Sequence, residues 1–143
     1  MQTSLPTRSA TDSFNRDPCV VLRVLLVEDS RVLAERLRES LELLDNVEVV
    51  GSVAEESTAV TAVRDKQVDV IVLDLQLKEG TGFGVVQRLG SKRPTVIVFT
   101  NYMLPEYERL ADSLGIEYFL NKSKDYERLP QLIQELEEAR GRA

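Results

Sequence analysis

The sequence contains no histidine, and this absence excludes several kinds of chemistry. Without histidine the chain cannot assemble a Ser-His-Asp or Cys-His catalytic site, a histidine-ligated zinc site, or a phosphohistidine of its own. The single cysteine, Cys19, cannot form an internal disulfide, which fits a reducing compartment. Any chemistry must therefore rest on carboxylates, hydroxyl groups, lysine or backbone groups.

An apolar run long enough to span a membrane and an excess of positive charge are also missing. Residues 1–18 are polar, contain two prolines and lack the roughly 20 apolar residues of a membrane span. We expect them to form a flexible tail and residues 19–143 to form one domain, because about 150 residues is a usual domain size. The net charge of −6 disfavours direct binding to DNA or RNA. We therefore expect a cytoplasmic protein that binds neither nucleic acid nor membranes.

Strand-like and helix-like segments alternate five times along the rest of the chain. The expected strands are apolar, β-branched runs at residues 20–27, 47–53, 68–74, 95–100 and 117–120. Apolar residues at helical spacing follow them at residues 30–44, 54–64, 83–89, 105–114 and 123–140. This alternation predicts an α/β fold, with a parallel five-stranded sheet between two layers of helices.

The last expected helix contains two features that need a separate interpretation. Pro130 donates no amide and its ring clashes with the preceding turn, so the regular helix should begin near this residue. The charged run at residues 135–140 is expected to form an exposed helix face.

Polar side chains stand where four of the expected strands end. Glu28 and Asp29 follow the first strand, Asp74 ends the third, Thr100 ends the fourth, and Lys122 follows the fifth. Each alone has an ordinary explanation in a helix start, a turn, a strand or a solvated surface. In a parallel sheet, however, all five would converge at one edge, where three carboxylates repel one another unless a cation such as Mg²⁺ intervenes. Lys122 and Thr100 could then hold a phosphoryl group on Asp74.

The segments that carry these residues resemble the receiver domain of two-component response regulators. They are V-L-L-V-E-D-S (24–30), V-I-V-L-D-L (70–75), V-I-V-F-T (96–100) and Y-F-L-N-K-S (118–123), and the resemblance covers about residues 20–140. It implies a flavodoxin-like, doubly wound fold with strand order 2-1-3-4-5 and five helices. It also implies a phosphoryl group received from a sensor histidine kinase or a phosphotransfer protein. Because the sequence ends soon after the last helix, we expect a stand-alone receiver without an output domain, similar to the chemotaxis regulator.

The same resemblance implies a role for each residue of the metal site. Asp74 would accept the phosphoryl group and contact Mg²⁺. Asp29 would bind the ion directly, Glu28 would hold it through water, and Gln76 would contribute its backbone carbonyl.

Three further residues would bind the phosphoryl group and respond to it. Lys122 would contact the phosphate, while Thr100 and Phe119 would be the switch residues that move after phosphorylation. Their movement would shift the population of two states of one surface, formed by the fourth helix, fifth strand and fifth helix. A downstream protein target would bind there.

Three positions depart from the family pattern. Ser123 follows Lys122 where a cis proline is usual, and we expect a trans peptide because a cis bond costs about 2.5–4 kcal/mol at other residues. Asn101 follows the switch threonine where a small residue is common. We hypothesise that Asn101, with Tyr102, narrows access to the phosphoacceptor and slows phosphorylation by small donors. Phe119 lacks a tyrosine hydroxyl, so its inward position gains no hydrogen bond.

Two other functions are compatible with the sequence. A pseudo-receiver would keep the fold and bind partners without phosphorylation, and a Mg²⁺ titration would distinguish it. A hydrolase or phosphatase with a nucleophilic aspartate would generally need a second aspartate two residues later, where this chain has Gln76. We therefore expect no turnover of an external substrate, only the Mg²⁺-dependent gain and hydrolysis of the chain's own aspartyl phosphate.

Overall fold

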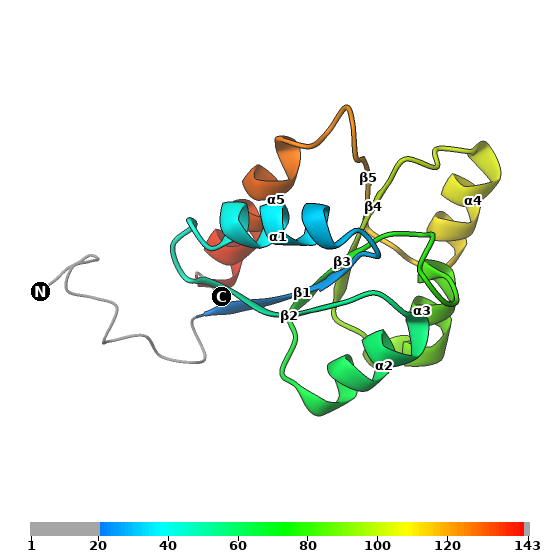
Figure 1. The fold of residues 1–143 in the computed structure, drawn as a ribbon, viewed down its shortest axis with the longest axis horizontal. Coiled ribbons are helices and arrows are strands. Elements are labelled where there is room, and N and C mark those ends of the chain that lie inside the picture. The colour runs from blue at the N-terminus through cyan, green and yellow to red at the C-terminus, as the bar shows by residue number, and fades with distance from the viewer. Residues whose placement is uncertain (1–20, 142–143) are drawn as a thin grey trace, which may run out of the picture.

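The computed structural model describes residues 21–141. The expected tail, residues 1–18, lies outside this described range. Within it, strands and helices alternate as the sequence predicts (Figure 1). The elements are β1 (Leu22–Val27), α1 (Arg31–Leu41), β2 (Val47–Val53), α2 (Glu56–Asp65), β3 (Val70–Leu73), α3 (Gly82–Leu89), the 3-10 turn η2 (Gly90–Lys92), β4 (Thr95–Thr100), α4 (Pro105–Ser113), β5 (Tyr118–Asn121) and α5 (Arg128–Gly141).

The strands form one parallel sheet in the order β2-β1-β3-β4-β5. This is the doubly wound order that the family resemblance implies, with β1 and β3 inside the sheet. Both central strands consist mainly of buried aliphatic residues, because helices cover both faces of the sheet. The predicted fold is therefore confirmed.

Two apolar cores lie on opposite faces of the sheet. Alternate residues of β1 supply them: Leu25 and Val27 belong to one core, and Val24 and Leu26 to the other. Residues of α2, α3 and α4 complete the first core, and residues of α1 and α5 complete the second (Figure 1). Among the described residues, no helix has the length and apolarity needed to span a membrane.

The last helix agrees with the sequence at its start and differs from it near its end. α5 begins at Arg128, so Pro130 lies in the first turn, where its missing amide donor costs no helical hydrogen bond. The sequence predicts that the charged run at residues 135–140 is exposed. This prediction is wrong at Glu137, which is only 8% exposed. Glu137 faces Asn46, just before β2, and its carboxylate accepts a hydrogen bond from that side chain.

Candidate functional site

Parallel register places the first two acidic residues at the same level of the sheet. Val27 pairs with Leu73, so Glu28 and Asp74 are the next residues on neighbouring strands. The ladder continues past the strand ends: the Asp74 amide donates to the Val27 carbonyl at 3.0 Å, and the Glu28 amide donates to the Val53 carbonyl at 2.9 Å. The main chain of Asp74 is thus tied to β1, and that of Glu28 to β2 at the edge of the sheet.

Lys122 joins two of the three carboxylates at this edge. Its Nζ lies 2.7 Å from Glu28 Oε1 and 2.7 Å from Asp74 Oδ2, and both acidic residues are 5% exposed. Asp29 is exposed and completes the group, because carboxylate oxygens of the three acidic residues lie within 4.8 Å of one another. We call Glu28, Asp29, Asp74, Thr100 and Lys122 the carboxyl-edge site.

Burial and pairing oppose each other in the electrostatics of the site. Burial raises the pKa of the Glu28 carboxyl, although hydrogen bonds from Lys122 and the Ser30 amide act to lower it. Burial also acts to lower the pKa of Lys122, but the hydrogen bonds to Asp74 and Glu28 outweigh it and raise this pKa. Lys122 is therefore held in its charged form beside the two acids.

The group of side chains fits a hard divalent cation. Three carboxylates share one ammonium, which leaves an excess of negative charge in a partly desolvated place. Oxygen ligands of this kind are the ones that Mg²⁺ prefers. The residues present therefore satisfy the chemical requirement of a magnesium site, with Asp29 on its exposed side.

The loop after β3 packs against the backbone of Asp74. The Gln76 amide donates to Asp74 Oδ1 at 3.4 Å, which brings the Gln76 backbone beside the site. Gly82, at the start of α3, packs so closely against the Asp74 carbonyl that an added Cβ would collide with it. A glycine is thus required for this approach, and the metal-binding role of the Gln76 carbonyl stays a prediction.

Thr100 and Phe119 occupy neighbouring strands. Thr100 is fully buried, its Oγ1 accepts a hydrogen bond from the Tyr102 amide at 3.2 Å, and its carbonyl accepts one from the Lys122 amide at 3.0 Å. Phe119 pairs with Val98 and is half-buried. Phe119 also lines a cavity of about 490 Å³ between α4 and β5. The role of Thr100 and Phe119 as switch residues stays a prediction.

The sequence-family model named response regulator receiver domain matches residues 24–134 of this chain. The chain belongs to the response regulator receiver family. Response regulators of this family work in two-component systems. The family match covers the whole carboxyl-edge site, from Glu28 to Lys122.

Two curated relatives share sequence with this chain over most of its length. The transcriptional regulatory protein DesR of Bacillus subtilis is 28% identical over 114 residues, which make up 80% of this chain and 57% of DesR. Protein-glutamate methylesterase/protein-glutamine glutaminase 1 of Xanthomonas campestris is 35% identical over 109 residues, which make up 72% of this chain and 30% of that protein. The receiver therefore spans less than two thirds of the length of either relative.

Solved structures share the fold of the receiver. A LuxR-family two-component response regulator from Aurantimonas has a TM-score of 0.75 at 23% identity, covering 83% of this chain and 86% of that chain. A CheY-like response regulator receiver domain protein from Methanospirillum hungatei has a TM-score of 0.75 at 17% identity, covering 85% and 98%. At these identities the likeness establishes the fold alone.

The loop after β5 carries contacts of the receiver that the sequence analysis missed. No cis peptide bond occurs among the described residues, so the predicted trans bond between Lys122 and Ser123 is confirmed. Asn121 Oδ1 accepts hydrogen bonds from the Ser123 and Lys124 amides, each at 2.8 Å, and the Asn121 amide donates to Asp125 Oδ2 at 2.9 Å. Asparagine and aspartate near a strand end were the available signal, because both commonly bond to nearby backbone in turns.

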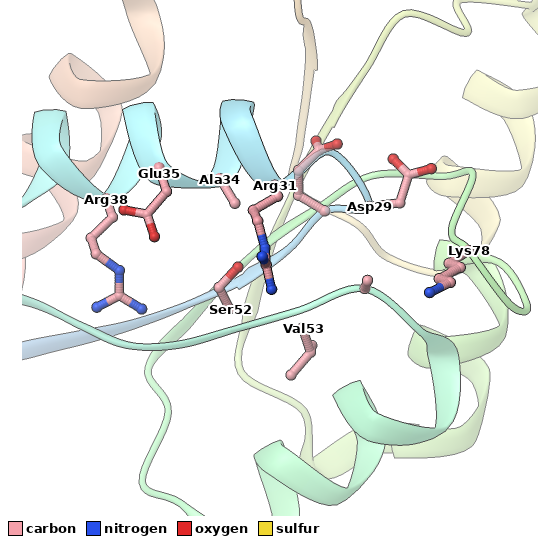
Figure 2. Close-up of a pocket in the computed structure, with 10 residues that line it drawn as sticks. Asp29, Arg31, Ala34, Glu35, Arg38, Ser52, Val53 and Lys78 are labelled. Atoms are coloured by element: carbon pink, nitrogen blue, oxygen red, sulfur yellow. The ribbon is translucent and has the colours of Figure 1, made fainter.

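A second feature missed from the sequence is a cavity of about 550 Å³ that begins at Glu28 and Asp29. It lies between α1, the end of β2 and the loop after β3. In Figure 2 the Arg31 side chain extends from α1 toward Ser52. Lys78 lines the cavity from the loop after β3. These basic residues are far apart in sequence, so no local pattern could have predicted that they line one cavity beside the acidic group.

Proposed function

We propose that this receiver accepts a phosphoryl group on Asp74 from a phosphohistidine of a sensor histidine kinase or a phosphotransfer protein. The observation that carries the proposal is the Lys122 ammonium, 2.7 Å from both Glu28 and Asp74 within the group of three carboxylates. An ammonium beside a buried aspartate can pair with phosphoryl oxygens after that aspartate has reacted. Membership of the receiver family supports the same role.

The transfer requires an ionised Asp74 carboxylate as the nucleophile. One of its oxygens forms a bond to phosphorus while the bond from phosphorus to the partner's histidine nitrogen breaks, and that nitrogen keeps the electron pair. The Lys122 ammonium and the Thr100 hydroxyl then donate hydrogen bonds to the phosphoryl oxygens. Water reverses the modification by hydrolysing the acyl phosphate, and no other substrate is turned over.

We assign the metal ligands to the same edge. Asp29 and Asp74 would bind Mg²⁺ directly, Glu28 would hold it through water, and the Gln76 carbonyl would complete the protein ligands. When bound, the ion supplies the positive charge that offsets the repulsion among carboxylates and phosphoryl oxygens.

The proposed output is a change in protein binding. Thr100 turning toward the phosphoryl group and Phe119 turning inward would alter the surface of α4, β5 and α5, where a downstream protein would bind. A LuxR-family relative of known structure is described as DNA-binding, but this chain has a net charge of −6, which disfavours contact with a phosphate backbone. We therefore propose that residues 19–143 act as a cytoplasmic receiver through protein contacts, and that they bind neither DNA nor membranes.

The test is the intact mass after incubation with Mg²⁺ and a panel of small phosphodonors and histidine kinases. We expect one added phosphoryl group on the wild-type chain, none on Asp74→Asn, and none when Mg²⁺ is removed. Asp69→Asn is the matched control, because Asp69 lies just before β3 at the opposite end of the same strand, and it should still be modified.

The alternative outcome is equally defined. If no donor modifies the wild-type chain and the chain does not bind Mg²⁺, the proposal is wrong. The fold would then act as a pseudo-receiver that binds its partners without phosphorylation.

A further inference from the structure

The residues that directly follow Thr100 and Lys122 contact each other. Ser123 Oγ donates a hydrogen bond to Asn101 Oδ1 at 3.2 Å, although the two residues are 22 positions apart in the sequence. Asn101 belongs to the loop between β4 and α4, and Ser123 belongs to the loop between β5 and α5. This hydrogen bond therefore joins the loop that follows the switch threonine to the loop that follows the phosphate-binding lysine.

The Ser123 side of this contact is fixed by its own loop. The Ser123 amide donates to Asn121 Oδ1 at 2.8 Å, and Asn121 is in turn bonded through its amide to Asp125 Oδ2. The Asp125 amide donates back to the Asn121 carbonyl at 2.8 Å. Reciprocal hydrogen bonds of this kind restrict the conformation of the loop and so fix the position of the Ser123 hydroxyl.

The Asn101 side is attached to the residue that must move. Thr100 Oγ1 accepts a hydrogen bond from the Tyr102 amide at 3.2 Å, so the hydroxyl is engaged with the residue on the other side of Asn101. Turning this hydroxyl toward a phosphoryl group on Asp74 breaks that bond and changes the path of residues 100–102. Asn101 lies in this segment, so its hydrogen bond to Ser123 opposes the change.

We propose that the Asn101–Ser123 hydrogen bond is a latch that holds the β4–α4 loop in its unphosphorylated position. The inference rests on the proposed function, because it assigns a cost to the movement of Thr100 toward phosphorylated Asp74. Asn101 and Ser123 are positioning residues, since they act through Thr100 without touching the phosphoryl group. Breaking the latch favours the switched state, and so raises the affinity of the site for a phosphoryl group or its analogue.

The latch differs from simple steric cover by Asn101. Cover depends on the size of the Asn101 side chain and changes the rate at which a donor reaches Asp74. The latch depends on both partners and changes an equilibrium. Removing the Ser123 hydroxyl leaves the bulk of Asn101 in place, so Ser123→Ala separates the two effects.

The experiment measures binding of beryllofluoride, a phosphoryl analogue, to the full chain with Mg²⁺ by NMR titration. We expect Ser123→Ala and Asn101→Ala each to bind it about 2- to 5-fold more tightly than wild type, the lower part of the range for one neutral hydrogen bond. The double variant should match the single variants, because both remove the same interaction. Ser123→Thr keeps the hydroxyl and should bind like wild type. Ser113→Ala removes an exposed serine of α4 that bonds only within its helix, and it should change nothing.

Each result decides a different question. If beryllofluoride does not bind the wild-type chain, the proposed function fails and there is no switched state for a latch to oppose. If wild type binds it and Ser123→Ala binds it equally well, only the latch is wrong, and the same holds if the effects of the two variants multiply. Phosphorylation from acetyl phosphate gives the second readout: a faster rate in Asn101→Ala alone supports steric cover by Asn101, and an unchanged rate contradicts it.

Discussion

The two ends of the parallel sheet carry the same types of charged residue in different proportions. At the amino ends of the strands, Asp69 Oδ2 accepts a hydrogen bond from the Arg23 amide at 2.8 Å and lies 3.2 Å from Arg140 Nη1. Arg23 also pairs with Glu48 at 3.3 Å. Acidic and basic side chains are thus matched in this group, which we call the amino-edge network.

At the carboxyl ends, three acids lie close together, and Lys122 forms ion pairs with two of them, Glu28 and Asp74. Matched charges with hydrogen bonds hold secondary-structure elements together, whereas an excess of buried like charge lowers stability. The fold keeps that unfavourable group at the edge where the receiver family binds its ion. In close contacts, acids and bases are therefore paired in the amino-edge network, whereas the carboxyl-edge site brings three acids to one lysine.

The largest expected effect comes from removing an acid at the carboxyl edge. Asp29→Ala should weaken Mg²⁺ binding by about 100-fold or more, because even residues that only orient metal ligands cost about 10- to 100-fold when they are lost. Stability without Mg²⁺ should not fall, since Asp29 is exposed and its loss relieves repulsion with Glu28 and Asp74. Calorimetric Mg²⁺ titration and urea unfolding measure the two effects. A destabilised variant with unchanged Mg²⁺ affinity would contradict the assignment of this edge.

The same substitution at the other edge should have the opposite pattern. Asp69→Ala should lower the free energy of unfolding by about 1–3 kcal/mol, because the Arg23 amide loses its side-chain acceptor and the ion pair between Asp69 and Arg140 is removed. Mg²⁺ affinity should stay at the wild-type value. Urea unfolding and Mg²⁺ titration on the same sample check this prediction. If Asp69→Ala lost Mg²⁺ affinity while keeping its stability, the comparison of the two edges would be wrong.

The smallest effect concerns Glu137, a buried acid at the amino end of the sheet. Burial raises the pKa of its carboxyl and nearby Glu138 and Asp45 raise it further, whereas the hydrogen bond from Asn46 and the charge of Arg140 act to lower it. A raised pKa means that the folded state holds the proton more tightly than the unfolded state. This stabilisation is full below the ordinary glutamate pKa, about 4.3, and is lost as pH rises through the folded value.

Glu137→Gln should therefore be more stable than wild type at pH 7, and the difference should shrink as the pH falls toward 4. The amide side chain introduced at this position would keep an oxygen to accept the hydrogen bond that Gln134 donates to Glu137 at 3.2 Å. Glu135→Gln, at an exposed position of the same helix, is the control for the loss of one negative charge. Thermal unfolding at both pH values measures it, and a Glu137→Gln variant less stable than wild type at pH 7 contradicts it.

The sequence alone is sufficient to predict which residues lie together where one structural rule relates position along the chain to position in the fold. Buried β-branched runs predict parallel strands, and parallel strands bring their carboxyl ends to one edge, so the sequence pattern is enough to group Asp74, Thr100 and Lys122. The strand order follows from family resemblance. Pro130 also marks the start of α5 to within two residues, because its chemistry restricts where a helix can hold it.

The rest depends on how separate segments meet. The Ser123–Asn101 bond needs two loops at a set distance, and neither loop has a pattern that fixes it. Glu137 looks like one of several exposed charges in the sequence, but the rotation of α5 about its axis turns it toward Asn46. Asn46 itself has a φ of 59°, a left-handed conformation outside any repeating pattern. Such details follow from tertiary packing and are invisible to local periodicity.

One contact at the amino edge has a consequence for how the chain could be rewired. Arg140 Nη1 donates to the Val21 carbonyl at 2.8 Å, so the first strand and the last helix meet at residues 119 positions apart. The two ends of the described range lie together here, so a chain shortened to residues 21–141 could be closed by a short linker and opened elsewhere, for example beside the exposed Leu43. Such a circular permutant keeps every strand direction, and with it the convergence of acids and lysine. The carboxyl-edge site depends on the arrangement of the strands and not on the order in which the chain connects them.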